Sequence, residues 1–223
     1  MRTRTIEIAL TLAAALFVSS CATIQSNPVA SEVTPDAYAK SKSAKGVAVM
    51  AVNWERRWKC GSFENAEVMS LGFDRLPVTN SAPEAPASVF IDGPPRLAKK
   101  RGFENYALLL EPGEYALSSF DVKVARSVSD VGHFAVGRKN LIVKGEPKGG
   151  SFKVDAGEIV YVGNFFVECL PGSATLWRFY TEGHDGFGSH MNEFKQKYPF
   201  LDLTTVQYRL FRTSVIGQDY ELK

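Results

Sequence analysis

Three histidines, His133, His184 and His190, are the residues whose side chains could bind a metal ion, and Glu182 and Glu193 lie near two of them. Zinc sites hold their ligands at short, fixed spacings on a strand or a helix. His184 and His190 are instead separated by a glycine-rich segment. We therefore predict no metal and no other cofactor, and we interpret the histidines as exposed loop residues, with His190 in the first turn of a helix.

Residue types that serve in nucleophilic or acid–base catalysis occur without a recognisable pattern. There is no Gly-x-Ser-x-Gly elbow, no P-loop and no dinucleotide-binding fingerprint. Ser189 directly precedes His190, and a helix N-cap explains this serine better than a triad does. Glu111 and Glu114 flank a turn, where carboxylates are solvated. We predict that the chain is not an enzyme; the alternative is a periplasmic hydrolase of cell-wall or glycan material, whose carboxylates only folding would bring together.

Two basic stretches could bind an anion. Residues 54–59, Trp-Glu-Arg-Arg-Trp-Lys, interleave two tryptophans with charged side chains, and the cations and indole rings there could meet anionic glycan or lipid head groups. The candidate binding surface consists of Trp54, Arg56, Arg57, Trp58 and Lys59. The second stretch is residues 99–101, Lys-Lys-Arg. As the alternative, both tryptophans of the first stretch pack around Cys60, and the alkyl stems of Arg56 and Lys59 cover them.

The N-terminus has the features of an export signal. Arg2 and Arg4 precede an apolar run over residues 8–18, which small residues follow. This run is about half of the roughly 20 apolar residues that a transmembrane helix needs. Residues 18–21, Val-Ser-Ser-Cys, resemble the lipobox of bacterial lipoproteins. The resemblance implies that residues 1–20 are removed and that Cys21 is acylated; ordinary signal cleavage without a lipid is the alternative.

The lipobox resemblance also implies a location. Ala22 follows the cysteine, and in enterobacterial lipoproteins a residue other than aspartate favours transfer to the outer membrane. We expect the protein to be lipid-anchored there, facing the periplasm. The chain carries 26 Lys and Arg residues against 24 Asp and Glu residues. Because this charge balance creates no global attraction for polyanions, we expect no nucleic-acid partner.

Cys60 and Cys169 are the two cysteines that remain once Cys21 is lipidated. Cysteines of exported proteins usually pair in their oxidising compartment. We therefore predict a disulfide, which closes a loop of about 110 residues and stabilises the fold by up to about 4–5 kcal/mol in the chain-entropy model. Two separate buried thiols are the alternative. A catalytic cysteine is disfavoured, because neither residue has a histidine nearby in sequence.

From residue 46 onward the pattern predicts β-strands. Residues 46–52 are apolar on both faces, as in a buried strand. Further runs rich in aromatic and β-branched residues are punctuated by Gly, Pro or Asp. They cover residues 66–73, 87–91, 106–110, 115–124, 140–143, 151–154, 159–169, 175–181 and 204–214. Residues 111–114 and 155–158 are predicted turns. Strands at this spacing predict a mainly β fold, an antiparallel β-sandwich with one short C-terminal helix.

The remaining segments divide the chain. A helix near the end has Ser189 as its N-cap and stops at Pro199. The proline-rich stretch 76–101, apart from 87–91, and the stretch 125–139 are predicted connections. Residues 21–45 are predicted to be a lipidated N-terminus and flexible tether with a reach of about 25–30 Å. The predicted organisation is thus a signal peptide at 1–20, this tether, and a β-sandwich domain at 46–223.

Two segments of the sequence resemble a known family of proteins. Residues 109–117, Leu-Leu-Glu-Pro-Gly-Glu-Tyr-Ala-Leu, resemble a strand-turn-strand phrase of bacterial lipoproteins with a transthyretin-like or carboxypeptidase-regulatory-like β-sandwich. Residues 152–163 resemble the phrase that commonly follows it. The resemblance implies a small β-sandwich lipoprotein of unassigned role without catalytic residues, so no site residue is carried over from it.

Together these observations predict a membrane-anchored periplasmic lipoprotein that acts as a non-catalytic binding or envelope-assembly module. Its partners would be the membrane, through the lipid anchor, and an envelope protein or glycan. The proline-rich loop, residues 54–59 or an edge strand that accepts a partner strand would form the contact. Besides the hydrolase, a structural or stress-related envelope protein without a discrete ligand is an alternative.

Overall fold

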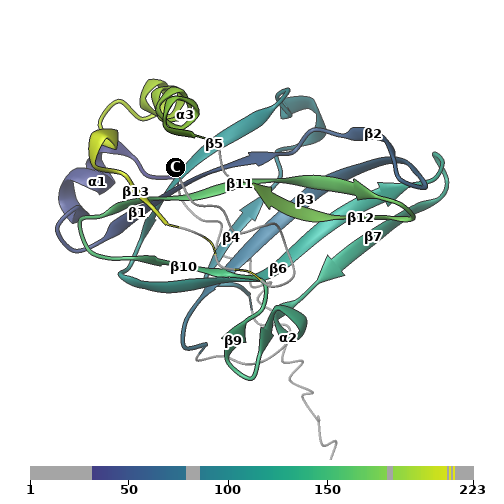
Figure 1. Cartoon of the computed structure of the whole chain (residues 1–223), viewed down its shortest axis with the longest axis horizontal. Helices are drawn as coiled ribbons and strands as arrows, with labels where there is room; N and C mark the ends of the chain where they lie inside the picture. Colours follow the sequence, from purple (N-terminus) through teal and green to yellow (C-terminus); the bar gives the residue numbers. More distant parts are fainter. Residues whose placement is uncertain (1–31, 79–85, 180–182, 210, 212, 214–223) are drawn as a thin grey trace, which may run out of the picture.

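The computed structural model describes residues 32–78, 86–179, 183–209, 211 and 213. Two β-sheets pack face to face, and short helices lie at the periphery (Figure 1). This confirms the predicted mainly β fold with a helix near the C-terminus. Within the described ranges, no helix is both long and apolar enough to cross a membrane.

The first sheet has β1 at its centre. Its strand order is β12 (Ser173–Phe179), β11 (Ile159–Leu170), β1 (Gly46–Asn53) and β5 (Phe103–Leu110), and β13 (Gln207–Tyr208) also pairs with β11. The β1–β11 and β11–β13 pairs are parallel, whereas the other pairs of this sheet are antiparallel. Because β1 is buried on both faces, its sequence is a continuous apolar run, as predicted.

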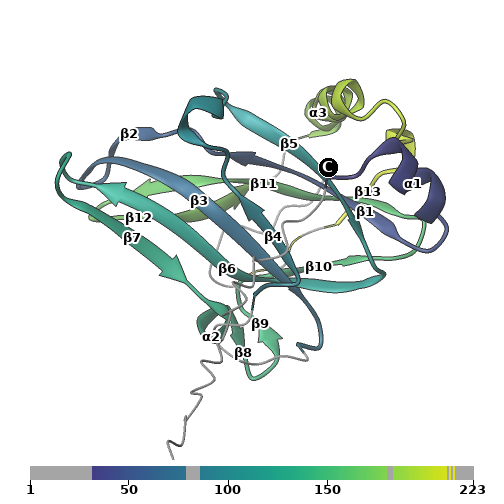
Figure 2. The same ribbon diagram turned by 180° about the vertical axis from the view of Figure 1, so that it is seen from behind.

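The second sheet is built on two long antiparallel strands, β3 (Phe63–Arg75) and β6 (Gly113–Ala125), which lie side by side in Figure 2. At one edge, β2 (Arg57–Cys60) and β4 (Val89–Asp92) pair with β3. At the other edge, β10 (Ser151–Val154) and β7 (Val131–Val136) pair with β6. A separate two-stranded sheet joins β8 (Ile142–Val143) and β9 (Glu146–Pro147).

The hydrophobic core fills the space between the two sheets. An aromatic cluster of Phe73, Phe152, Phe165 and Phe211 lies there, with ring centroids 5.8–6.4 Å apart. Fully buried Arg178 donates a hydrogen bond to the carbonyl of Phe211 and lies over its ring. These contacts draw residues from both sheets into one core.

The predicted disulfide between Cys60 and Cys169 is present. It joins β2 of the second sheet to β11 of the first sheet, and the two Cα atoms are 4.8 Å apart. The bond therefore fastens the short edge strand β2, which carries part of the basic stretch 54–59, to the opposite layer of the sandwich.

Helix α1 (Pro35–Ser41) corrects the predicted flexible tether. Thr34 is its N-cap and accepts a hydrogen bond from the backbone N–H of Ala37. Val33 is buried, and its N–H donates to the carbonyl of Ala107 in β5 over 2.8 Å. Glu32 accepts hydrogen bonds from Lys197 and Tyr198. Residues 32–45 are therefore part of the folded domain, because a buried valine and a capped helix tie them to it.

Three other predicted boundaries differ from the structure. The expected connection 125–139 contains β7, because residues 131–136 pair one to one with residues of β6. The expected strand 140–143 is divided between α2 (Arg138–Leu141) and β8. In the expected strand 204–214, the described residues include the end of the 3₁₀-helix η2 (Leu203–Thr205), and only Gln207–Tyr208 form a strand, the short β13.

Helix α3 (Gly183–Lys197) begins before its predicted cap at Ser189 and ends, as predicted, just before Pro199. Its buried residues Met191 and Phe194 pack against the hydrophobic core of the domain. The 3₁₀-helix η1 (Arg96–Ala98) interrupts the proline-rich connection between β4 and β5.

Candidate anion-binding site

Trp54 corrects one part of the predicted binding surface. The residue follows β1, its side chain is only 2% exposed, and its Nε1 donates a 2.8 Å hydrogen bond to the hydroxyl of Tyr106. The two rings meet edge to face. A tryptophan can be buried when its N–H has an acceptor, so Trp54 belongs to the core and is not available to a partner.

Trp58, four residues later, has the opposite environment. It lies on edge strand β2, and its side chain is 63% exposed. The guanidinium of Arg56 lies 5.5 Å from the centroid of its ring. Arg57 and Lys59, on the same strand, are exposed as well. Of the residues predicted to form a binding surface, Arg57, Trp58 and Lys59 are therefore exposed, and the alternative in which both tryptophans pack around Cys60 is wrong for Trp58.

Glu67 is the residue that organises this surface, and the sequence analysis did not identify it. Side chains alternate along β3, so Glu67 faces away from the core that its neighbours Ala66 and Val68 enter. Its side chain is nevertheless only 5% exposed, because cations cover it. In the sequence, its only signal was that Glu67 is the one acidic residue of the predicted strand 66–73.

Three cations surround the carboxylate of Glu67. Lys99 Nζ lies 2.8 Å from Oε2, and Arg56 Nη2 lies 3.1 Å from Oε1. Lys123 Nζ, from the directly opposite position on β6, lies 3.6 Å from Oε1. Burial by itself would raise the pKa of Glu67, but the hydrogen bonds and charges of Lys99 and then Arg56 outweigh it and hold the pKa below its ordinary value.

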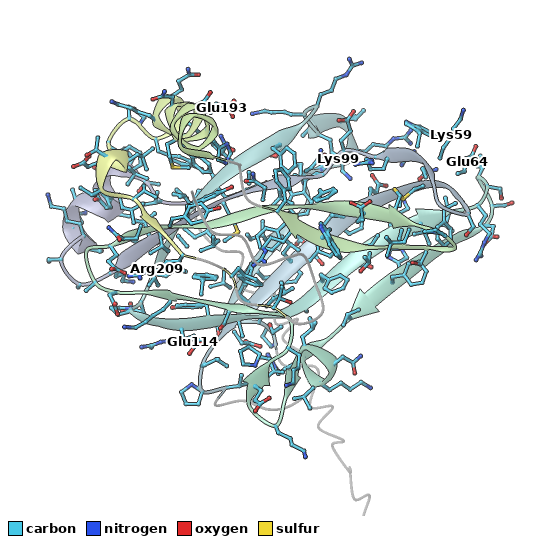
Figure 3. The ribbon with its side chains drawn as sticks, in the orientation of Figure 1. Lys59, Glu64, Lys99, Glu114, Glu193 and Arg209 are labelled. Carbon is cyan, nitrogen blue, oxygen red and sulfur yellow. A yellow bond between two sulfur atoms is a disulfide. The ribbon has the colours of Figure 1, made fainter. Side chains whose placement is uncertain are left out.

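Because Arg56 and Lys99 bind the same carboxylate, the two basic stretches of the sequence meet at one place. A hollow of about 240 Å³ lies between them, which we call the basic hollow. Its lining residues are Glu55, Arg56, Trp58, Glu67, Arg96, Lys99, Lys100 and Arg101. Glu55 accepts a 3.2 Å hydrogen bond from the backbone N–H of Gly102, at the end of the connection between β4 and β5. Figure 3 shows Lys99 and Lys59 toward the end of the sandwich that is remote from Glu193 of α3.

Cations outnumber carboxylates in the basic hollow. Five of its lining residues are Lys or Arg and two are Glu. Arg96, Lys100 and Arg101 are exposed, and they form no hydrogen bond or ion pair with other described residues. Guanidinium and ammonium groups without a carboxylate partner favour phosphate or carboxylate ligands. The arrangement therefore suits an anion, and the exposed ring of Trp58 offers an apolar face beside it.

A second buried carboxylate on β3 serves a different purpose. Asp74 accepts a 2.7 Å hydrogen bond from Nε of Arg138 and a 3.0 Å hydrogen bond from the N–H of Ser88. This ion pair connects α2 to β3, on the same outer face of the second sheet as Glu67 but away from the basic hollow. Asp74 is thus a natural control for Glu67.

The histidines differ from their predicted positions. His133 lies on β7, and its Nδ1 is 2.9 Å from Oδ2 of Asp121. His190 lies within α3, packs edge to face against Tyr161 and Phe194, and is largely buried. Burial lowers the pKa of His190, although the charge of Glu193 acts in the opposite direction. Among the residues that the structure describes, no group of three side chains could hold a metal ion.

The predicted lipidation site Cys21 and the signal peptide at 1–20 lie outside the described residues. The side chain of His184 also lies outside them. Comparison of the chain with protein-family models, curated proteins and solved structures found no match.

Proposed function

We propose that this protein is a lipid-anchored, non-catalytic binding module of the bacterial cell envelope that holds an anionic partner in its basic hollow. The observation that carries the proposal is the meeting of two distant basic segments around Glu67, which leaves Arg96, Lys100 and Arg101 without partners among the described residues. The N-terminal signal and the lipobox-like residues before Cys21 support the anchor and an outer-membrane location facing the periplasm.

The composition of the basic hollow supports binding in preference to hydrolysis. A glycosidase needs a carboxyl group that stays protonated near neutral pH to act as general acid. The pKa of Glu67 is shifted in the opposite direction, and two strong hydrogen bonds from cations occupy its oxygens. No serine, threonine, cysteine or histidine is among the lining residues of the hollow. The chemistry that these side chains support is the neutralisation of a bound anion.

The docked segment 32–45 supports a short connection between anchor and domain. With Cys21 as the acylated residue, the chain from there to Glu32 can span at most about 40 Å, even when fully extended. The fold thus shortens the connection expected from sequence, in which all residues up to 45 were flexible. A domain on so short a connection works close to the membrane that holds its anchor.

One experiment tests the site. The chain contains three tryptophans, and ¹⁵N labelling of their indole N–H groups gives three resolvable signals. Titration with glycerol phosphate should shift the signal of Trp58, which lines the basic hollow, and leave that of Trp54 in place. The signals are assigned with Trp58→Phe and Trp54→Phe. A Trp58 signal that no phosphate-bearing compound moves, or that moves equally in the double variant Lys100→Glu, Arg101→Glu, would contradict the proposed site.

A second experiment tests the anchor. The intact mass of the protein extracted from native membranes should correspond to residues 21–223 with acyl groups on Cys21. A mass that corresponds to an unacylated chain would remove the anchored part of the proposal while leaving the anion site standing.

A further inference from the structure

Leu97 is the most exposed apolar side chain in the described part of the protein, and it lies beside the basic hollow. It belongs to η1, at the tip of the connection between β4 and β5, and it is fully exposed. The preceding residue, Arg96, lines the hollow, as do three cations that follow, Lys99, Lys100 and Arg101. A single exposed leucine is ordinary on a protein surface. An apolar tip within a group of cations, next to an exposed tryptophan, is a more specific combination.

We propose that the basic hollow docks on an anionic phospholipid surface, with Leu97 and Trp58 entering the interfacial region and Arg96, Lys100 and Arg101 meeting the head-group phosphates. This inference rests on the proposed function, because it names the anion that the hollow holds. Tryptophan is favoured at membrane–water interfaces, and Lys and Arg near an anionic bilayer add attraction residue by residue. An apolar side chain that projects into solvent has no role in holding a small soluble anion, whereas it gains a partner at a bilayer.

The geometry of the N-terminal segment permits this docking. Glu32 pairs with Leu108, two residues before the end of β5, and β5 begins at Phe103, two residues after Arg101. The strand distance from Leu108 to Phe103 is about 17 Å. The connection from Cys21 to Glu32 can span up to about 40 Å, more than twice that distance. An acyl anchor at Cys21 and the basic hollow can therefore contact the same membrane together.

Docking would also give the protein a second attachment to the membrane, in addition to its acyl anchor. Acyl chains and a basic patch that contact the same bilayer act as two membrane signals, and the second signal orients the domain as well as holding it. In this orientation the end of the sandwich that carries Lys59 and Lys99 faces the membrane, and α1, at the opposite end, faces away from it (Figures 1 and 3).

The test uses the mature chain with Cys21→Ser, so that membrane binding reports on the domain without acyl chains. It is sedimented with vesicles of phosphatidylglycerol mixed with phosphatidylcholine, and with vesicles of phosphatidylcholine alone. We expect binding to the anionic vesicles only. The double variant Lys100→Glu, Arg101→Glu should bind them at least about tenfold more weakly. The matched control Lys40→Glu, Lys42→Glu makes the same charge change on exposed residues at α1 and should bind like the parent chain.

Leu97→Ser separates this inference from the proposed function. It should weaken binding to anionic vesicles several-fold and leave the shift of the Trp58 signal with soluble glycerol phosphate unchanged. If glycerol phosphate moves the Trp58 signal but no vesicle binds, the docking inference fails and the anion site stands. If neither occurs, both fail. Tighter binding to a soluble polycarboxylate glycan, with polygalacturonate as the probe, than to vesicles would overturn the inference in favour of a glycan ligand.

Equal loss of vesicle binding in the Lys40→Glu, Lys42→Glu control would also overturn the inference, because it would show that overall charge, and not the basic hollow, drives the binding.

Discussion

Lys99 donates a 2.8 Å hydrogen bond to Glu67, a residue 32 positions earlier, and this bond brings the proline-rich connection onto the outer face of β3. Arg56 reaches the other oxygen of the same carboxylate. One buried acidic side chain thereby positions both walls of the basic hollow. The cations that it does not bind are left for a ligand.

Replacement of this carboxylate should destabilise the fold and disturb the site together. Glu67→Gln leaves Arg56 and Lys99 without a counter-charge in a largely buried position, so we expect a loss of about 1–3 kcal/mol in the free energy of unfolding. Urea denaturation measures the loss. Asp74→Asn removes the other buried carboxylate of β3 and should cost a similar amount. Only Glu67→Gln should move the indole signal of Trp58; an equal effect of both variants on that signal would show that Glu67 does not position the hollow.

The stability of the protein should fall in acid through Glu67. Folding lowers the pKa of this residue below its ordinary value of 4.5. Its stabilising contribution is therefore complete above that pH and is lost as the pH falls through the lower pKa of the folded state. Urea midpoints measured from neutral pH downward should show a loss below about pH 4.5 that is smaller in Glu67→Gln. Parallel pH profiles of the two proteins would contradict the ion-pair assignment.

His190 should add a separate acid sensitivity at higher pH. Burial lowers its pKa from 6.5, so below that pH the unfolded chain takes up a proton more readily than the folded protein does. Stability should then decline as the pH falls below about 6.5. His190→Asn should remove this slope while leaving the Glu67-dependent loss in place. The pH dependence of the urea midpoint distinguishes the contribution of His190 from that of Glu67. If the slope below about pH 6.5 persists in His190→Asn, another group causes it.

The two tryptophans of the stretch 54–59 should respond differently to the same substitution. Trp54→Phe removes a buried hydrogen bond and leaves the Tyr106 hydroxyl without its donor, so we expect a loss of about 1–3 kcal/mol. Trp58→Phe changes an exposed side chain and should alter stability by less than about 0.5 kcal/mol. Vesicle binding should show the reverse order, with the larger effect from Trp58→Phe. Equal stability losses would contradict the assignment of one residue to the core and the other to the surface.

The disulfide should matter for both the fold and the site. Cys60→Ser combined with Cys169→Ser should cost about 2–5 kcal/mol, measured by urea denaturation. Because Cys60 ends β2, loss of the bond should also broaden or shift the indole signal of Trp58, two residues earlier, more than that of Trp54. The parent protein treated with a reductant is the matched control and should reproduce the stability of the double variant.

Much of the fold could be predicted from local sequence because strands, turns and caps depend on neighbouring residues. The apolar run at 46–52, the strand at 151–154 and the turn at 155–158 agree with the structure, whereas only residues 111–112 of the predicted turn 111–114 lie between β5 and β6. The strand β7 was harder to predict. None of its residues is buried and its sequence shows no alternation of polar and apolar residues, so only its pairing with β6 makes it a strand. The flexible tether was wrong for residues 32–45 because a short helix there gains its stability from packing on the domain.

The sequence by itself determined the β architecture and the presence of two basic stretches, since these follow from periodicity and composition. It also predicted the pairing of Cys60 with Cys169, the two cysteines that remain when Cys21 is set aside as the lipidation site. Only the tertiary structure decided that Trp54 is buried and Trp58 exposed, although both stand among the same charged neighbours. It alone brought Arg56, Lys99 and Lys123 to Glu67, because that meeting depends on the pairing of β3 with β6 and on the path of a long loop, neither of which any local pattern encodes.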